Sequence, residues 1–277
     1  MAKKLYEESS VSGIAAAIRA KGGSGTFTVG EMAQAISDLP SGGGGEWTTA
    51  GIAKNTEPSG AITLKPQDRG NAWKFAENYA FHNKPITSVV FDFNNYVGGV
   101  RGASECFAGS TLQTVSFINY ASASWKPEAT FKNADKLLAF ECPVPLDFAG
   151  YNQSFYQCKS MTRLSVPYGM GSMFAPCQNC NVLEYADMGS ATDMWGNAFG
   201  NCYKLQTLIL RRTDGVVPLT NVSAFNNTPM RGYDGLSGEI YVPNALISTY
   251  QTASNWSTIY AEGHVTFKKI EGSAYEL

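Results

Sequence analysis

Hydrophobic residues recur at fixed offsets between Phe81 and Phe225, with a period of about 24 residues. In the cleanest copies, a phenylalanine is followed by a small residue three positions later and by apolar residues six, nine and eleven positions later. The copies from Phe81 and Phe107 are one residue shorter, and the last copy departs from the pattern after Thr228. The full offsets are kept in the copies that begin at Phe131, Phe155, Phe174 and Phe199.

The last apolar positions of each copy alternate, as in Leu164 and Val166, which predicts a short strand with one buried face. A single copy cannot bury enough apolar surface to fold alone, so neighbouring copies must complete a shared core. We therefore expect residues 46–242 to form a repeat solenoid whose short strands pair into a continuous parallel sheet.

A different unit precedes the repeats. Residues 1–40 predict a small helical hairpin, because a capping box of Thr28 and Glu31 opens its second helix. A glycine-rich linker follows at residues 41–45. The hairpin either packs back onto the repeats as a cap or docks onto a larger assembly, and the linker favours docking. The candidate docking residues are the apolar ones of the two helices, Ile14, Ile18, Met32, Ile36 and Leu39.

The carboxyl-terminal residues predict a cap. A strand from Glu239 to Val242 ends at Pro243, Asn244 is placed to cap a helix, and a last alternating strand runs from His264 to Ile270. We expect residues 243–277 to cover the open end of the core, as terminal repeats must.

Composition excludes several classes of protein. Among the 277 residues, 44% are hydrophobic and 16% are charged, which is typical of a globular chain. The net charge of −2 and the absence of basic runs argue against nucleic acid as a partner. No stretch of about 20 apolar residues predicts membrane insertion. The first residues lack the pattern of a signal peptide, so we expect synthesis in a cytoplasm without secretion.

The six cysteines fit the repeat better than they fit a metal site. Cys158, Cys177 and Cys202 occupy the small position of their copies, whereas Cys106 lies outside the pattern. Cys177 and Cys180 form a C-x-x-C motif, but no second pair of ligands stands at matching spacing. We therefore expect reduced, buried thiols that act as small hydrophobes, with no metal and no cofactor.

The Phe-x-x-Cys-x-x-Leu-x-x-Leu phrase resembles the BspA-type leucine-rich repeat. The closing segment, Ile240-Tyr-Val-Pro243 through Asn255-Trp-Ser257, is similar to the end of such proteins from gut bacteria and their phages. The opening, from Ile14 to Gly22 and from Glu31 to Ile36, resembles a helical module of tail proteins from phages that infect Gram-positive bacteria. Together, these resemblances cover nearly the whole chain.

The resemblance implies a virion tail protein, either a tail fibre or a tail-tip adhesin that binds a host cell-surface protein or glycan. It further implies that residues 1–40 bind other virion tail proteins and that the chain forms a homotrimer, as fibres do. Two alternatives stay open: a purely architectural virion component, and a leucine-rich-repeat adhesin of the bacterial surface.

An adhesin of this kind would bind through side chains that point away from the core. On the strands, the positions between the buried residues predict an exposed ladder. Its candidate residues are Ser88, Val90, Asp92, Ser116, Ile118, Glu141, Arg163, Ser165, Glu184, Thr207, Ile209 and Arg211. Four aromatic residues outside the repeat pattern are candidates for stacking on sugars or, alternatively, for packing in loops: Trp125, Tyr151, Tyr168 and Trp195.

No catalytic set competes with binding, so we expect a protein that is not an enzyme. The two histidines, His82 and His264, lie far apart in the chain, and no nucleophile stands at a typical spacing from them. Carboxylates of different repeats, such as Glu141 and Glu184, keep glycan hydrolysis as a minor alternative.

Overall fold

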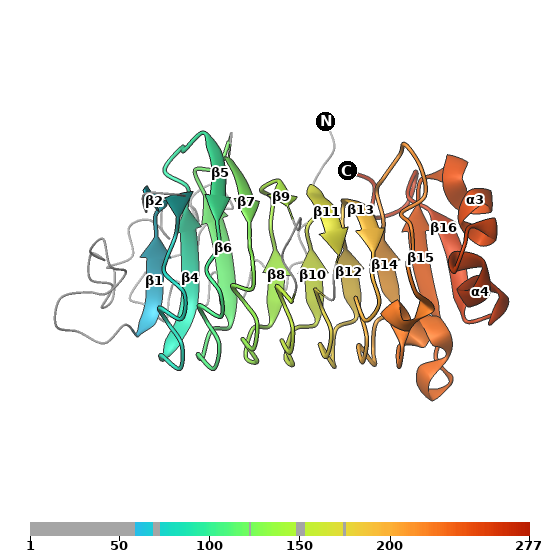
Figure 1. The fold of residues 1–277 in the computed structure, drawn as a ribbon, viewed down its shortest axis with the longest axis horizontal. Coiled ribbons are helices and arrows are strands. Elements are labelled where there is room, and N and C mark those ends of the chain that lie inside the picture. Colours follow the sequence, from blue (N-terminus) through green and yellow to red (C-terminus); the bar gives the residue numbers. More distant parts are fainter. Residues whose placement is uncertain (1–58, 69–72, 122, 148–152, 174–175) are drawn as a thin grey trace, which may run out of the picture. The chain divides into compact units, whose positions relative to one another are not determined.

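The computed structural model describes residues 59–277, with the exception of 69–72, 122, 148–152 and 174–175 (Figure 1). All of them belong to one compact unit of the chain, Gly43–Leu277. The hairpin expected at residues 1–40 and the linker expected at 41–45 lie outside the described residues. The same holds for the docking candidates Ile14, Ile18, Met32, Ile36 and Leu39.

The first set of strands follows the predicted pattern and lies in two parallel sheets, in chain order (Figure 1). The three-stranded sheet contains β1 (Gly60–Leu64), β4 (Ile86–Asp92) and β6 (Thr114–Ile118). The six-stranded sheet contains β8 (Ala139–Glu141), β10 (Arg163–Ser165), β12 (Tyr185–Asp187), β14 (Thr207–Ile209), β15 (Gly238–Val242) and β16 (Val265–Lys269).

A second set of strands forms a seven-stranded sheet, which was not expected from the sequence. Its strands follow those of the first set along the chain, and all its pairings are parallel except that of β2 with β3. Several of its strands carry glycine or polar residues at alternate positions, so their hydrophobic periodicity is weak. Its members are β2 (Gln67–Asp68), β3 (Trp73–Lys74), β5 (Gly98–Arg101), β7 (Ala123–Lys126), β9 (Leu146–Asp147), β11 (Gly169–Met173) and β13 (Ser190–Met194).

The phenylalanines that open the repeats, which we call lead residues, stack on one another in the core. Ring centroids lie 5.3 Å apart for Phe81 and Phe107, 5.8 Å for Phe107 and Phe131, and 5.6 Å for Phe131 and Phe155. The planes of each pair are within 17° of parallel. All four side chains are completely buried. Each copy therefore supplies one half of a contact that only the next copy completes.

The copy predicted to begin at Phe174 was assigned wrongly, because Cys177 occupies the lead position. In the strand register, Leu164 of β10 pairs with Ala186 of β12, which pairs with Leu208 of β14. This register places Cys177 midway between Phe155 and Phe199. Phe174 itself lies outside the described residues, and Tyr185, which the earlier assignment placed in the core, is only half-buried.

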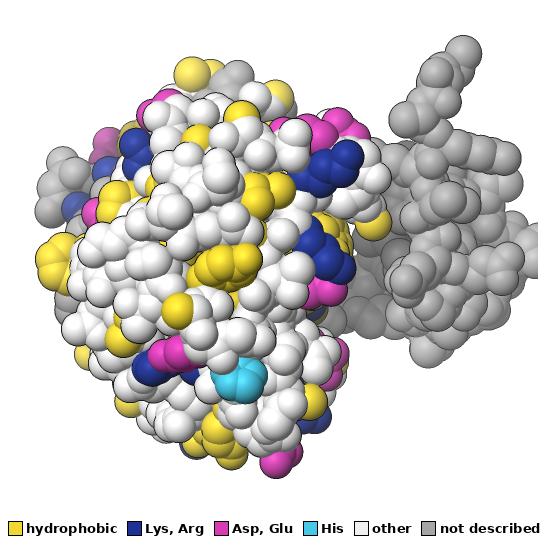
Figure 2. Space-filling model, turned by 90° about the vertical axis from the view of Figure 1, so that its right-hand side faces the viewer, with side chains coloured by type: hydrophobic (Ala, Val, Ile, Leu, Met, Phe, Trp, Pro, Cys, Tyr) yellow, Lys and Arg dark blue, Asp and Glu magenta, His cyan; other side chains and the backbone are white. Residues whose placement is uncertain are grey.

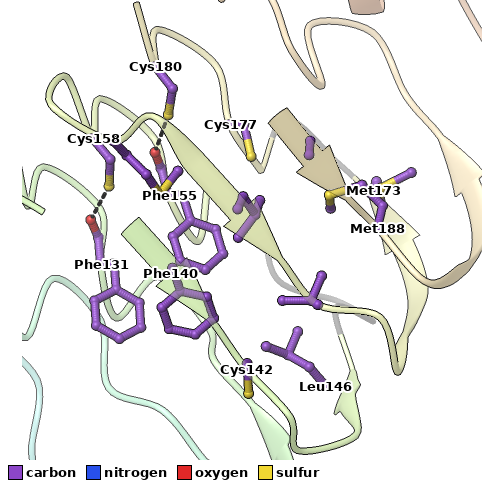
Figure 3. Packing of buried hydrophobic residues seen from close by; sticks show 14 of the residues in the cluster. Phe131, Phe140, Cys142, Leu146, Phe155, Cys158, Met173, Cys177, Cys180 and Met188 are labelled. Atoms are coloured by element: carbon purple, nitrogen blue, oxygen red, sulfur yellow. Dashed lines mark hydrogen bonds between the residues drawn. The ribbon is translucent and has the colours of Figure 1, made fainter. Parts of the chain in front are cut away.

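The corrected register gives the buried thiols a common role. Cys158 donates a hydrogen bond from Sγ to the carbonyl of Phe131 at 3.1 Å, and Cys180 donates one to the carbonyl of Phe155 at 3.0 Å (Figure 3). Cys202 repeats this contact with the carbonyl of Cys177 at 3.1 Å. A thiol at the small position therefore satisfies the lead carbonyl of the preceding repeat, in addition to filling space.

The first set of strands is interrupted between β6 and β8. The break coincides with the change from the shorter copies to the full-length ones, which shifts the inward-facing position by one residue relative to the lead. A backbone hydrogen bond of 3.1 Å from Leu138 N to Gln113 O still joins the neighbouring repeats. Phe117 and Phe140 are also in contact, with ring centroids 5.6 Å apart.

The carboxyl-terminal segment covers the last repeats with two short helices, where one was expected. They are α3 (Ile247–Thr252) and α4 (Trp256–Ala261), and Asn255 between them has a positive φ of 62°. Asn244 makes no side-chain cap, since 3-10 helix η4 (Asn244–Leu246) comes first. Further 3-10 helices precede β15: η1 (Val222–Phe225), η2 (Pro229–Arg231) and η3 (Tyr233–Gly235).

The inner faces of these helices are buried. Tyr250, Trp256 and Ile259 are completely buried, and Val265 and Phe267 of β16 are nearly so. Seen from the side of α3 and α4, the surface carries only scattered hydrophobic side chains (Figure 2). This is the character that a terminal repeat needs in order to face water.

Replacing Phe199 by alanine should lower the free energy of unfolding by about 3 to 5 kcal/mol, because the stack with Phe225 is lost and a cavity remains. Chemical denaturation monitored by circular dichroism measures the change. Leu138→Ala, at a side chain that is 49% exposed, is the control and should change stability little. Equal stabilities of the two variants would contradict the lead stack.

None of the six cysteines should react with a thiol reagent in the folded protein at about pH 8. Burial raises the pKa of Cys106 and of Cys142 to about 12 and also raises the pKa of Cys158, Cys177 and Cys202. Against the effect of burial, hydrogen bonds from Cys158 and Cys177 lower the pKa of Cys180, but its completely buried sulfur is out of reach of a reagent. Titration with Ellman's reagent should find six thiols only after denaturation. Asp214→Cys should add one thiol that reacts in the native state. Rapid modification of any native cysteine would show that the core is open.

Candidate ligand-binding surfaces

The predicted ladder lies on the outer face of the first strands, but its members differ in exposure. Four of them are exposed: Ser116, Ile118, Glu141 and Glu184. Six are half-buried: Ser88, Val90, Arg163, Ser165, Thr207 and Arg211. The expectation of exposure is wrong for Asp92 and Ile209, which are buried.

Asp92 is buried because the end of β4 turns and uses the carboxylate as a local acceptor. Its Oδ1 accepts hydrogen bonds from the backbone N–H of Asn94 at 2.8 Å and from Nδ2 of Asn119 at 2.9 Å. Lys65 Nζ lies 3.5 Å from its other oxygen. The carboxylate thus joins the ends of three neighbouring strands, and we assign it a structural role.

Ile209 is buried because the end of the chain folds over the outer face of β14 and β15. It forms a small cluster with Tyr241 and Ile270, against which Tyr185 and Tyr275 pack. The rings of Tyr241 and Tyr275 have centroids 4.6 Å apart. The alternation of residues within β14 could not predict the burial of Ile209, because the covering side chains come from a segment far along the chain.

The charged groups of this face largely bind one another. Arg163 lies 2.8 Å from Glu141 and stands 3.7 Å from the centroid of the Tyr185 ring. Arg211 contacts both carboxylate oxygens of Asp187 at 2.6 to 3.1 Å, and the Asp187 side chain is 1% exposed. These pairs leave little charge on β8 to β14 for a ligand.

The four aromatic candidates differ in position and exposure. Trp125 is not in a loop: it lies in β7, faces the core with Ala123 and is completely buried. Its Nε1 has no hydrogen-bond partner within the described part of the chain. Tyr168 and Trp195 are 52% and 43% exposed, as a sugar-stacking residue must be. Tyr151 lies outside the described residues.

A third surface, missed by the sequence analysis, is the corner where the chain turns after each lead residue. The residue two positions after the lead has the left-handed conformation in every repeat, with φ between 55° and 66°. Asparagine and glycine tolerate this conformation best. The series is Asn83, Gly109, Asn133, Gln157, Asn179, Asn201 and Asn227.

In the last repeats, these amides hydrogen-bond to one another. Asn201 donates from Nδ2 to Oδ1 of Asn179, and Asn227 donates from Nδ2 to Oδ1 of Asn201, both at 2.7 Å. Asn201 thus donates to the preceding repeat and accepts from the following one. Such an amide ladder adds side-chain contacts to the backbone bonds at the same corner.

In the first repeats the same corner is open and forms a groove of about 390 Å³. Gly109 interrupts the amide series there, between Asn83 and Asn133. Within the described chain, the side chains of these two asparagines make no hydrogen bond. The charged and titratable residues of its lining are His82, Asp135, Lys136 and Lys159. A polar ligand is what this lining can bind.

The remaining chemical candidates do not assemble into a centre. The described residues contain no cluster of three histidine, cysteine or acidic side chains able to hold a metal ion. Glu141 ends β8 and Glu184 immediately precedes β12, so β10 lies between them. His82 lines the groove, whereas His264 stands beside Gly232 in the last repeats.

No protein-family model and no curated protein matches this chain. The resemblance to BspA-type repeats therefore remains a prediction based on the residues quoted above. None of the helices in the described residues has the length and apolar character needed to cross a bilayer.

Asn201→Ala should lower the free energy of unfolding by about 2 kcal/mol, because two amide hydrogen bonds are lost and alanine is strained at φ 62°. Asn201→Gly loses the same bonds without that strain and should cost less. Thermal and chemical unfolding of both variants measure the difference. Stability equal to that of the unmodified chain in both variants would contradict a role for the amide ladder.

Proposed function

We propose that this chain is a virion tail protein of a phage, built as a BspA-type leucine-rich-repeat solenoid, which attaches the particle to its host. Support for the solenoid comes from the parallel sheets, the lead stack and the backbone hydrogen bonds between successive repeats. A repeat stack of this kind displays one side chain per repeat along a continuous surface, which suits binding to an extended molecule.

The observation that carries the binding role is the groove beside Gly109. It crosses the corners of four successive repeats and is lined almost entirely by polar residues, two of whose amides have no partner in the described chain. Asn83 is exposed and Asn133 is half-buried, so both amides are accessible to a ligand. Accessible polar side chains on a rigid scaffold are typical of recognition surfaces.

The partners follow from the same proposal. The host side is a cell-surface protein or glycan, and the virion side is another tail protein bound through residues 1–40. A homotrimer is the assembly that a fibre would form. The protein is proposed to bind without catalysing a reaction, and its place is the tail of the particle.

The virion assignment is tested by immunogold electron microscopy with antibodies raised against the full chain. Labelled tails on intact particles are the expected result. Labelling of the surface of uninfected bacteria, with bare particles, would replace the proposal by a bacterial adhesin.

The adhesin role is tested with the fluorescently labelled full chain on cells of the host. Binding that an excess of unlabelled chain displaces is expected. Labelled tails on particles, combined with no cell binding by the chain, would assign a purely architectural role. Release of sugar fragments during the assay would support a glycan hydrolase instead.

A further inference from the structure

The groove owes its existence to one position in the amide series. Gly109 has φ 64°, like its asparagine and glutamine neighbours, but carries no side chain. A Cβ built on this glycine would collide with Oδ1 of Asn83, whose side chain leans over the vacant position. Any larger residue at 109 would therefore displace Asn83 and occupy the groove.

The charge of the lining is positive on balance. Lys136 lies 3.4 Å from Asp135, the one acidic residue of the lining, and both side chains are exposed. Lys159, from the next repeat, is exposed and has no ion-pair partner in the described part of the chain. A third lysine, Lys132, is not part of the lining and is bound to Glu105 at 3.1 Å. Lys159 is thus the charge that is available to a ligand.

The combination of groups selects a class of ligand. Amides offer both donors and acceptors, which match the hydroxyl groups of a sugar. An uncompensated ammonium favours a carboxylate or a phosphate. The groove is open, and Ala108 is its only lining residue with an apolar side chain, so it suits a polar chain that passes along it rather than an enclosed hydrophobic molecule.

We infer that the groove beside Gly109 binds an acidic saccharide, with Asn83 and Asn133 hydrogen-bonded to its hydroxyl groups and Lys159 facing its negative group. This inference rests on the proposed role as an adhesin and names the ligand class of that site. Carboxylated and phosphorylated sugars share the required chemistry, and the experiment below separates them.

Binding is measured by isothermal titration with the full chain and three saccharide probes of similar length: an oligogalacturonate, a phosphomannan oligosaccharide and neutral maltotetraose. A tetraglutamate peptide is the control for charge without sugar. At least one acidic probe should bind about tenfold or more tightly than the neutral one. Its affinity should fall as the salt concentration rises from about 0.05 to about 0.5 M. Equal affinity for the neutral probe, or binding of a tetraglutamate peptide as tightly as the acidic sugars, would overturn the inference.

Two variants locate the site. Gly109→Asn should abolish binding and keep the melting temperature, because asparagine occupies this left-handed position in neighbouring repeats. Lys159→Gln should weaken binding about tenfold. Lys204→Gln removes the same charge from an exposed position of a later repeat, away from the groove, and should change nothing.

Unchanged acidic-sugar affinity in Gly109→Asn or in Lys159→Gln overturns the site. Failure of the proposed saccharide site can be distinguished from failure of the proposed adhesin role. Cell labelling that persists in Gly109→Asn keeps the adhesin and rejects the groove. Saccharide binding by purified chain that labels no cells keeps the groove and rejects the host-attachment role.

Discussion

The contact between successive lead residues is the constraint on which the rest of the structure depends. The lead residues from Phe81 to Phe199 donate their backbone N–H to the next repeat, as Phe131 does to Ser154. Where the next lead is also a phenylalanine, the two rings lie flat on one another. Ring and backbone are therefore satisfied only in one register. That register fixes the positions of both strands and of the corner that follows.

The sequence was sufficient to predict the parallel strands, the buried leads and the carboxyl-terminal cap, because each is written in a short-range hydrophobic period. It was misleading where a residue broke the period. Phe174 was assigned to the lead position in place of Cys177, because the other lead residues are all aromatic. Trp125 was placed in a loop because the second sheet alternates too weakly to be recognised.

The binding surfaces were harder to foresee, for a different physical reason. The strand ladder depends on whether a distant segment covers it, as Tyr275 covers Ile209, and on whether its charges find partners in neighbouring repeats. The corner groove did leave a local signal, the amides two positions after each lead. That spacing can be interpreted only once the left-handed backbone conformation of these residues is known. The groove further depends on the absence of a side chain at Gly109, which interrupts the series.

The substitution of a thiol for a ring at Cys177 has a consequence for the middle of the core. Cys177 leaves out the ring that the other lead residues supply, and the long, unbranched side chains of Met173 and Met188 are completely buried in the same part of the core (Figure 3). Such side chains adapt their conformation to irregular space. A change in repeat length or curvature should therefore be accommodated more easily here than within an unbroken stack of rings.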